Sequence, residues 1–188
     1  QVPPPATLDW ELFQGPAPRA PYMDIYFDYN WHWFWQYGTA ETGNNAVHEL
    51  DICRWALQLN YPKQVNVTAG KQHYKDDGWQ MYDTMDATFT FGTGKVIRWD
   101  GKSRTNYQTY GLDRGSIIYG SKGTAILNRN GYKIFDLEGK LTRERKSDEV
   151  AQTTQPGGAG GMDGLHIMNF INTIRGKAAL QHQPITEG

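Results

Sequence analysis

The sequence predicts an α+β fold, in which an open, mainly antiparallel sheet of about six strands carries helices on one face. Segments that alternate apolar and polar residues predict the strands, most clearly at residues 83–91. Apolar residues at helical spacing predict two helices, one beginning at Asn44 and one near the C-terminus. No βαβ unit with a glycine-rich turn is present, so the sequence does not predict a dinucleotide-binding domain.

Length and composition limit the class of protein. The 188 residues fit one domain with a sizeable core, and the formal net charge of −1 gives no electrostatic case for nucleic acid or an anionic membrane. Cys53 is the single cysteine, which excludes an internal disulfide. The aromatic content of 13%, with seven tryptophans, is typical of proteins whose rings stack on apolar ligand faces.

The two ends of the sequence give little information on location. No signal peptide is visible and no apolar run reaches the roughly 18 residues of a membrane span. The chain begins at Gln1 without a methionine, so we expect a piece of a longer protein. The sequence does not decide between cytoplasm and periplasm.

Residues 1–30 are rich in proline and poor in periodicity, which predicts an extended arm with one short helical turn at residues 8–13. The densest aromatic run follows, at residues 29–38. If this run is extended, Trp31, Trp33 and Trp35 share one face and could stack on a sugar ring. The alternative is that these indoles pack in the core. No second ligand lies at metal-binding spacing from the nearby histidine of this run, His32, so a zinc site is not favoured.

The central helix is expected at residues 44–57, with Asn44 as its N-cap. Asn44, His48 and Asp51 are spaced i, i+4 and i+7, which places them on one face within an arc of roughly 60°. Trp55 extends this face by one turn. An imidazole beside a carboxylate can accept or deliver a proton near neutral pH, although the same pattern also fits a histidine that is merely satisfied by Asp51. The opposite face is predicted to pack on the core through Ala46, Leu50, Cys53 and Leu57.

The rest of the sequence predicts strands, one long loop and a final helix. The Gly-Thr-Gly-Lys of residues 92–95 predicts a hairpin rather than a phosphate-binding loop. Residues 138–160 are expected to form a mobile loop, and the glycines of 157–161 do not complete a dinucleotide motif. Asp163 is expected to cap a helix that ends at Gly176. The expected strands are 65–74, 83–91, 95–104, 115–120, 124–127 and 131–136.

The pattern Gly-Asn-x-x-Val-His-Glu-x-Asp-x-x-Arg-Trp at residues 43–55 resembles the start of the C-terminal domain of the Gfo/Idh/MocA oxidoreductases. The resemblance extends over most of residues 8–188 and is also marked at 115–136. It implies a fold like the C-terminal domain of glyceraldehyde-3-phosphate dehydrogenase. Asn44 stands where the family has its first aspartate. Several bacterial branches of the family also have asparagine at this position.

The resemblance also implies a function and a set of site residues. It implies the substrate domain of an NAD(P)-dependent oxidoreductase that acts on a sugar or polyol, with His48 as proton acceptor and Asn44 beside it in the catalytic group. Asp51 and Tyr110, of the segment 110–114, are the substrate-binding residues that the resemblance implies, and Trp33 of the tryptophan run is a third candidate for substrate binding. No metal is implied.

Family architecture implies that the nucleotide-binding domain, with its catalytic lysine, precedes this region, and that a further helix follows it. We therefore expect the 188-residue chain alone to bind no NAD or NADP and to be inactive. Family members also associate into homo-oligomers through a sheet face. The alternatives are a non-catalytic carbohydrate-binding module, which the tryptophan run favours, and an oligomerisation module.

Overall fold

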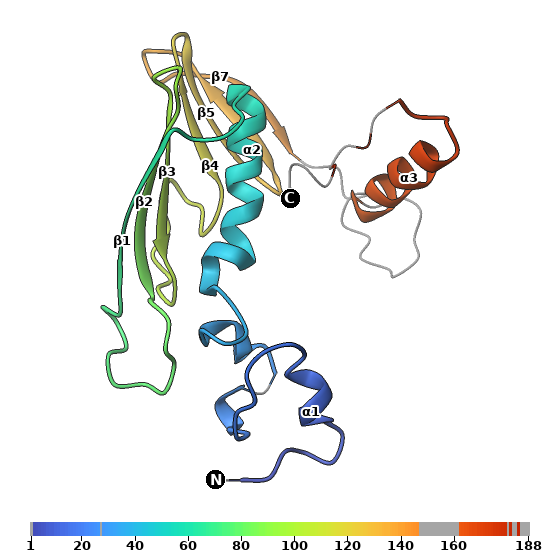
Figure 1. Cartoon of the computed structure of the whole chain (residues 1–188). Coiled ribbons are helices and arrows are strands. Elements are labelled where there is room, and N and C mark those ends of the chain that lie inside the picture. Colours follow the sequence, from blue (N-terminus) through green and yellow to red (C-terminus); the bar gives the residue numbers. More distant parts are fainter. Residues whose placement is uncertain (1, 27, 147–161, 180, 182–183, 185–188) are drawn as a thin grey trace. The chain divides into compact units, whose positions relative to one another are not determined.

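The computed structural model describes residues 2–26, 28–146, 162–179, 181 and 184 (Figure 1). The chain divides into two compact units, Gln1–Ile118 and Tyr119–Gly188. Both contain antiparallel strands together with few helices, which confirms the predicted α+β class. Whether the two units act as one domain, as the length suggests, stays a prediction.

The N-terminal residues form an aromatic cluster rather than an extended arm. The predicted short turn is α1 (Trp10–Phe13), where the carboxylate of Asp9 accepts a hydrogen bond from the N–H of Leu12 at 2.9 Å. Two short 3₁₀ helices follow, η1 (Asp24–Tyr26) and η2 (Asn30–Trp33). The buried members of this cluster are Trp10, Tyr22, Tyr26, Trp33, Phe34, Ala40 and Met81.

The 3₁₀ turn of η2 shows that the aromatic run at residues 29–38 is not extended throughout, which was the condition for a shared face of indoles. Such a turn repeats every three residues, so alternate indoles do not share a face. Trp33 is buried, whereas Trp35 is exposed. The chain also folds back tightly here, because a Cβ at Gly38 would lie 2.5 Å from the Cα of His32.

One helical segment runs from residue 40 to 57 and contains a π-helical turn, Thr42–Ala46 (η3), followed by α2 (Val47–Leu57). Asn44 therefore lies inside the segment, and the prediction that it caps the helix is wrong. The carboxylate of Glu41 bonds the side chains of both Asn44 and Asn45, which holds the wider turn in place. A π-helical turn also changes the face on which the residues before it lie.

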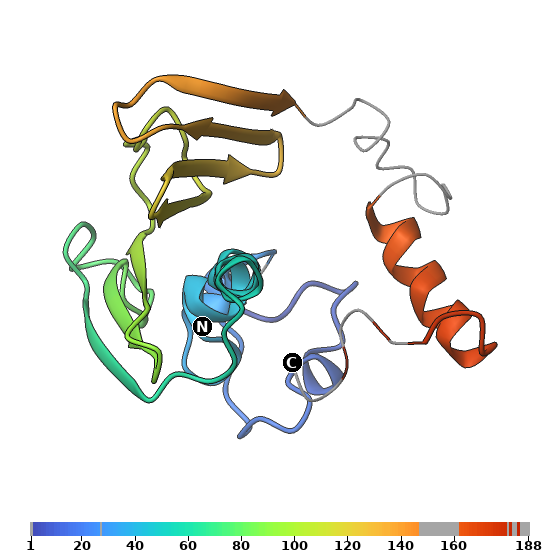
Figure 2. The ribbon, with the colours of Figure 1, turned by 90° about the horizontal axis from the view of Figure 1, so that it is seen from above.

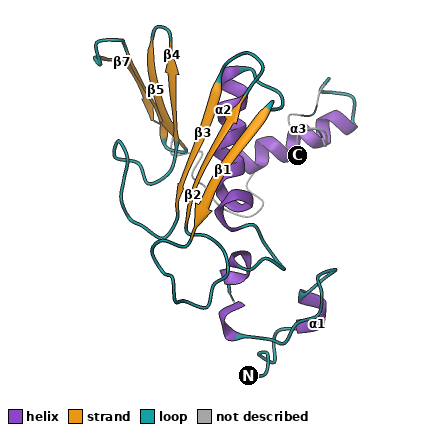
Figure 3. Cartoon of the chain, turned by 60° about the vertical axis from the view of Figure 1, so that its left-hand side comes forward, coloured by secondary structure: helices purple, strands orange, loops and turns teal. Residues whose placement is uncertain are grey.

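The first sheet consists of β1 (Gln64–Gly70), β2 (Thr84–Thr90) and β3 (Val96–Lys102), paired antiparallel in that order. Figure 3 shows α2 running along one face of this sheet. The predicted apolar stripe of α2 is confirmed, because Leu50, Cys53 and Leu57 pack with Leu59, Phe91 and Ile97. This packing leaves the opposite face of α2 free to carry polar groups.

The second sheet has the order β4-β5-β6-β7, and the boundary between the two units falls within β4 (Ser116–Gly120). Its other strands are β5 (Gly123–Asn128), β6 (Gly131–Phe135) and β7 (Leu141–Lys146), which lie side by side in Figure 2. The prediction of a single sheet of about six strands is therefore wrong. Strand β7 comes from a charged segment expected to be loop, and it is held by backbone pairing with β6 rather than by burial.

The expected last helix is α3 (Met162–Ile174), and Asp163 lies within it rather than before it. Gly176, with φ of 67°, follows its end as predicted. The glycine run at 157–161 lies outside the described residues. Among the helices described, none has the length and apolar character needed to cross a bilayer.

Candidate active site

The outer face of α2 presents His48, Asp51 and Trp55 to solvent, as the spacing predicted. His48 and Asp51 are three residues apart and both exposed, so they are neighbours on one helix face. The structure gives no hydrogen bond between these two side chains. Trp55 is 81% exposed, so most of its surface is open to solvent. This face can therefore contact a ligand through an imidazole, a carboxylate and an indole.

Asn44 makes its polar contacts with residues other than His48 and Asp51. Its side-chain carbonyl accepts a hydrogen bond from the hydroxyl of Tyr29 at 2.6 Å, and its Nδ2 donates to Oε1 of Glu41 at 3.3 Å. The side chain is half-buried. Asn44 is thus part of the polar contacts at the head of α2, whereas His48 lies one turn further along.

A second set of contacts joins α2 to the segment before β4. Nε of Arg114 lies 3.0 Å from Oε1 of Glu49, and Nη1 of Arg114 donates to Oδ1 of Asn45. Asn45 in turn donates to Oε2 of Glu41. Glu49 keeps only 12% of its side chain exposed, so this ion pair is shielded more than a surface pair. The segment that carries Tyr110 is therefore tied to the head of α2 through Arg114.

Tyr110 lies at the tip of a tight turn. The backbone groups of Thr109 and Leu112 exchange hydrogen bonds of 2.9 and 3.0 Å, which leaves Tyr110 and Gly111 as a two-residue loop. Both residues have positive φ, 55° and 75°, as a type I′ turn requires. Glycine accepts this conformation without strain, whereas a tyrosine does not. The phenol ring is presented to solvent with 64% of the residue exposed.

Trp33 is placed differently from the other candidate residues. It is only 6% exposed, and its ring stacks on Trp79 with centroids 5.1 Å apart. One ring face is thus already covered, and this leaves little room for stacking on a substrate. Trp35, from the same aromatic run, is 65% exposed. His32 is buried among aromatic rings, and among the described residues no cluster of three or more His, Cys, Asp or Glu could hold a metal ion.

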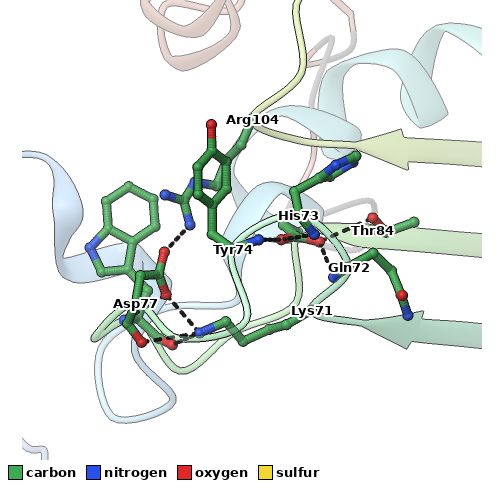
Figure 4. A network of polar contacts seen from close by, with 9 residues as sticks. Lys71, Gln72, His73, Tyr74, Asp77, Thr84 and Arg104 are labelled. Atoms are coloured by element: carbon green, nitrogen blue, oxygen red, sulfur yellow. Dashed lines mark hydrogen bonds and ion pairs between the residues drawn. The ribbon is translucent and has the colours of Figure 1, made fainter.

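The loop between β1 and β2 is fixed by two carboxylates (Figure 4). Asp77 pairs with Lys71 at 2.6 Å and with Arg104. The guanidinium of Arg104 lies between two rings, 3.9 Å from the centroid of Tyr74 and 4.1 Å from that of Trp79. Because Trp79 also stacks on Trp33, this loop and the aromatic cluster support each other.

Asp83 is the second carboxylate and is fully buried immediately before β2. Burial alone would raise the pKa of Asp83, but its oxygens accept hydrogen bonds from the backbone N–H groups of Gln72, Tyr74 and His73 and from the hydroxyl of Thr84. These bonds outweigh burial and lower the pKa to about 2. The loop is therefore anchored by an ionised, buried group.

Sequence reasoning missed the residues that organise the head of α2, namely Tyr29, Glu41, Asn45, Glu49 and Arg114. Glu41 stands three and four residues before the two asparagines, a spacing that could have indicated a local contact. The pairing of Arg114 with α2 gave no signal, because it joins positions 65 and 69 residues apart.

Comparison with family models identifies one family, and comparison with solved structures identifies proteins of similar fold. Residues 13–126 match the model of the GFO/IDH/MocA C-terminal domain. An oxidoreductase from Agrobacterium radiobacter, solved with NAD⁺, L-tartaric acid and magnesium, is similar in fold, with TM-score 0.52 and 14% identity over 74% of this chain and 40% of its own. Levoglucosan dehydrogenase in complex with NADH gives TM-score 0.55 and 14% identity over 85% of this chain and 47% of its own. The chain thus spans less than half of either protein. No curated protein matches it.

Proposed function

Because this chain belongs to the Gfo/Idh/MocA family through its C-terminal domain, we propose that it is the substrate-binding part of an NAD(P)-dependent oxidoreductase acting on a sugar or polyol hydroxyl. The family match over residues 13–126 is the observation that carries this proposal. It includes the whole of α2 and the Tyr110 turn. Levoglucosan dehydrogenase, similar in fold, supports a carbohydrate-type substrate.

His48 is the proposed proton acceptor. As the substrate hydroxyl is oxidised, its proton passes to the imidazole, which is exposed on α2 and free to receive it. Asp51, the neighbouring carboxylate, accepts a hydrogen bond from a second substrate hydroxyl and so orients the ring. Tyr110 and an exposed indole, Trp35 or Trp55, contact the rest of the substrate, and Trp33 supports the site from the aromatic cluster.

The oxidation needs a hydride acceptor, for which we propose NAD or NADP in the complete protein. Both structures named above contain NAD⁺ or NADH. The described sheets of this chain are antiparallel and contain no parallel βαβ unit, so these residues do not fit the cradle of a dinucleotide. The cofactor is therefore assigned to a part of the protein other than the described one.

The proposal is tested by assaying the complete protein with a panel of sugars and polyols and following the absorbance of reduced nicotinamide. We expect turnover with at least one substrate, and Asp51→Asn should raise its KM by about tenfold, which corresponds to roughly 1.4 kcal/mol of lost binding. No reduction of either dinucleotide by any sugar or polyol would contradict the proposal.

The exposed indoles Trp35 and Trp55 favour a second candidate, a non-catalytic carbohydrate-binding module. A sugar titration of the chain without nucleotide separates the two, because micromolar affinity in that experiment would favour the module. In either case we propose a homo-oligomer that uses the outer face of the first sheet, where Thr84, Asp86 and Thr88 lie beside Arg98.

A further inference from the structure

The Glu41 carboxylate is the one negative group shared by both asparagines of the π-helical turn. Asn44 Nδ2 donates to Oε1 of Glu41 at 3.3 Å, and Asn45 Nδ2 donates to Oε2. Adjacent residues of a helix usually point in directions about 100° apart. Both asparagines of the turn Thr42–Ala46 nevertheless reach one carboxylate, because Glu41 stands three and four residues before them and both spacings bring side chains together on a helix.

An ionised carboxylate only accepts hydrogen bonds, so it fixes the orientation of both amides. Each asparagine must direct its NH₂ group to Glu41, and each side-chain carbonyl then points away. The carbonyl of Asn44 accepts from the hydroxyl of Tyr29, and that of Asn45 accepts from Arg114. The charge at Glu41 thus determines that Tyr29 and Arg114 meet the carbonyl of an asparagine rather than its NH₂ group.

We propose that Glu41 is a positioning residue that orders the head of α2, and that positions 41 and 44 together hold one negative charge. A second carboxylate at position 44 would face that of Glu41 across a contact that is now 3.3 Å, in a half-buried setting. The amide at Asn44 is therefore required by Glu41. The structural part of this proposal does not depend on the reaction, and only its effect on catalysis rests on the proposed function.

The charge-exchange variant Glu41→Gln/Asn44→Asp gives the most direct test. In this variant the new amide at position 41 can donate to the new carboxylate at position 44 and accept from Asn45. That carboxylate can still accept from Tyr29, so the contacts with Asn45 and Tyr29 are kept while the charge moves by three positions. The one contact of position 41 that changes is the approach of its carboxylate to Nε2 of His32, at 3.9 Å. In Glu41→Gln alone two NH₂ groups meet, and in Asn44→Asp alone two carboxylates meet. The exposed carboxylate of Glu11, paired with Arg19 at 3.0 Å, provides the control Glu11→Gln.

Thermal unfolding of the full 188-residue chain at pH 7 and the NMR signals of the asparagine side-chain NH₂ groups provide the measurements. We expect each single variant to lower Tm by roughly 2–4 °C and to shift the Asn45 NH₂ signals. The exchange variant should return Tm to within about 1 °C of the parent protein, as should Glu11→Gln, because paired or exposed charges cost little. If the exchange variant loses the sum of the two single losses, or if the single variants behave like Glu11→Gln, the proposal is wrong.

The catalytic part is tested separately in the complete protein. Glu41→Gln should raise KM about threefold or more with little change in kcat. The exchange variant should return KM most of the way to the value of the parent protein. If Tm and the NMR signals follow the expected pattern but no variant of the protein oxidises a sugar or polyol, the positioning role stands and the proposed function fails.

Discussion

At the scale of single residues, the conformation of Tyr110 carries a cost that its contacts do not explain. Its φ of 55° is unfavourable for an aromatic residue, and its ring is exposed. Asparagine is the residue that such a turn prefers. Tyr110→Asn should therefore raise the free energy of unfolding by about 1 kcal/mol while it raises KM for the sugar about tenfold. Urea unfolding and steady-state kinetics measure the two effects.

Tyr107 is the matched control, because it is also exposed but does not have a positive φ. Tyr107→Asn should change neither stability nor KM appreciably. If Tyr110→Asn is more stable but binds substrate normally, Tyr110 is a strained surface residue without a part in the site.

The buried carboxylate of Asp83 predicts how the free energy of unfolding depends on pH. Its folded pKa of about 2 lies below the ordinary value of 3.8, so its ionised form stabilises the fold. This contribution, about 2 kcal/mol, is complete above the unfolded pKa and is lost as the pH falls through the folded pKa. Asp83→Asn should lower the free energy of unfolding by at least that amount at pH 7, and the difference from the parent protein should shrink between about pH 4 and pH 2.

Asp86 serves as the control for Asp83. It lies three residues further along, on β2, where it keeps 41% of its side chain exposed and pairs with Arg98. Asp86→Asn should cost less than about 1 kcal/mol at pH 7, as exposed ion pairs do. Equal losses for the two variants would show that burial of Asp83 does not matter.

At the scale of elements, α2 connects the core to the candidate site, and Cys53 reports on its packing. Burial of the thiol raises the pKa of Cys53, with Glu49 acting in the same direction, and a hydrogen bond with Ser116 only partly offsets them. A thiol with a raised pKa is less often in the reactive thiolate form. Cys53 should therefore react with a disulfide reagent about tenfold more slowly in the native chain than in the urea-unfolded chain.

Two variants test whether the slow reaction of Cys53 depends on the packing of α2. Leu57→Ala opens the cluster that contains Cys53 and should speed the reaction, whereas Ala56→Ser on the exposed side should not. A native thiol that reacts as fast as the unfolded one would mean that α2 does not stay packed on the first sheet.

The elements also show what local patterns can predict. The apolar stripe of α2 and the alternation of β2 follow from periodicity, because the apolar face of each packs against one hydrophobic cluster. The π-helical turn does not follow from periodicity, and one of its residues, Asn45, contacts both the nearby Glu41 and the distant Arg114. Strand β7 has no buried face at all, so no hydrophobic pattern could reveal it.

At the scale of the whole molecule, the chain matches less than half the length of NAD-containing structures with a similar fold. We expect the isolated chain to bind NAD and NADP with a Kd weaker than about 10 μM, or roughly −7 kcal/mol, because its described sheets offer no dinucleotide cradle. Calorimetry with each dinucleotide measures this. Tighter binding would contradict our proposal that the dinucleotide binds to another part of the protein.

The candidate site could be predicted only in part from the sequence. The positions of His48 and Asp51 follow from helix geometry, which depends on local spacing. The burial of Trp33 and the attachment of the Tyr110 segment depend on residues far along the chain, Trp79 in one case and Glu49 in the other. Such contacts are formed by tertiary packing, and a residue pattern does not record them.

The central claim is that His48 accepts the proton of the reacting hydroxyl, and the kcat of His48→Ala in the complete protein tests it most directly. Because His48 is exposed on α2, its removal leaves no buried partner unsatisfied, so Tm should stay within about 1 °C. We expect kcat to fall by about 10²–10⁴-fold, the usual contribution of a general base. A kcat within about threefold of the parent enzyme, well short of that loss, would contradict the account.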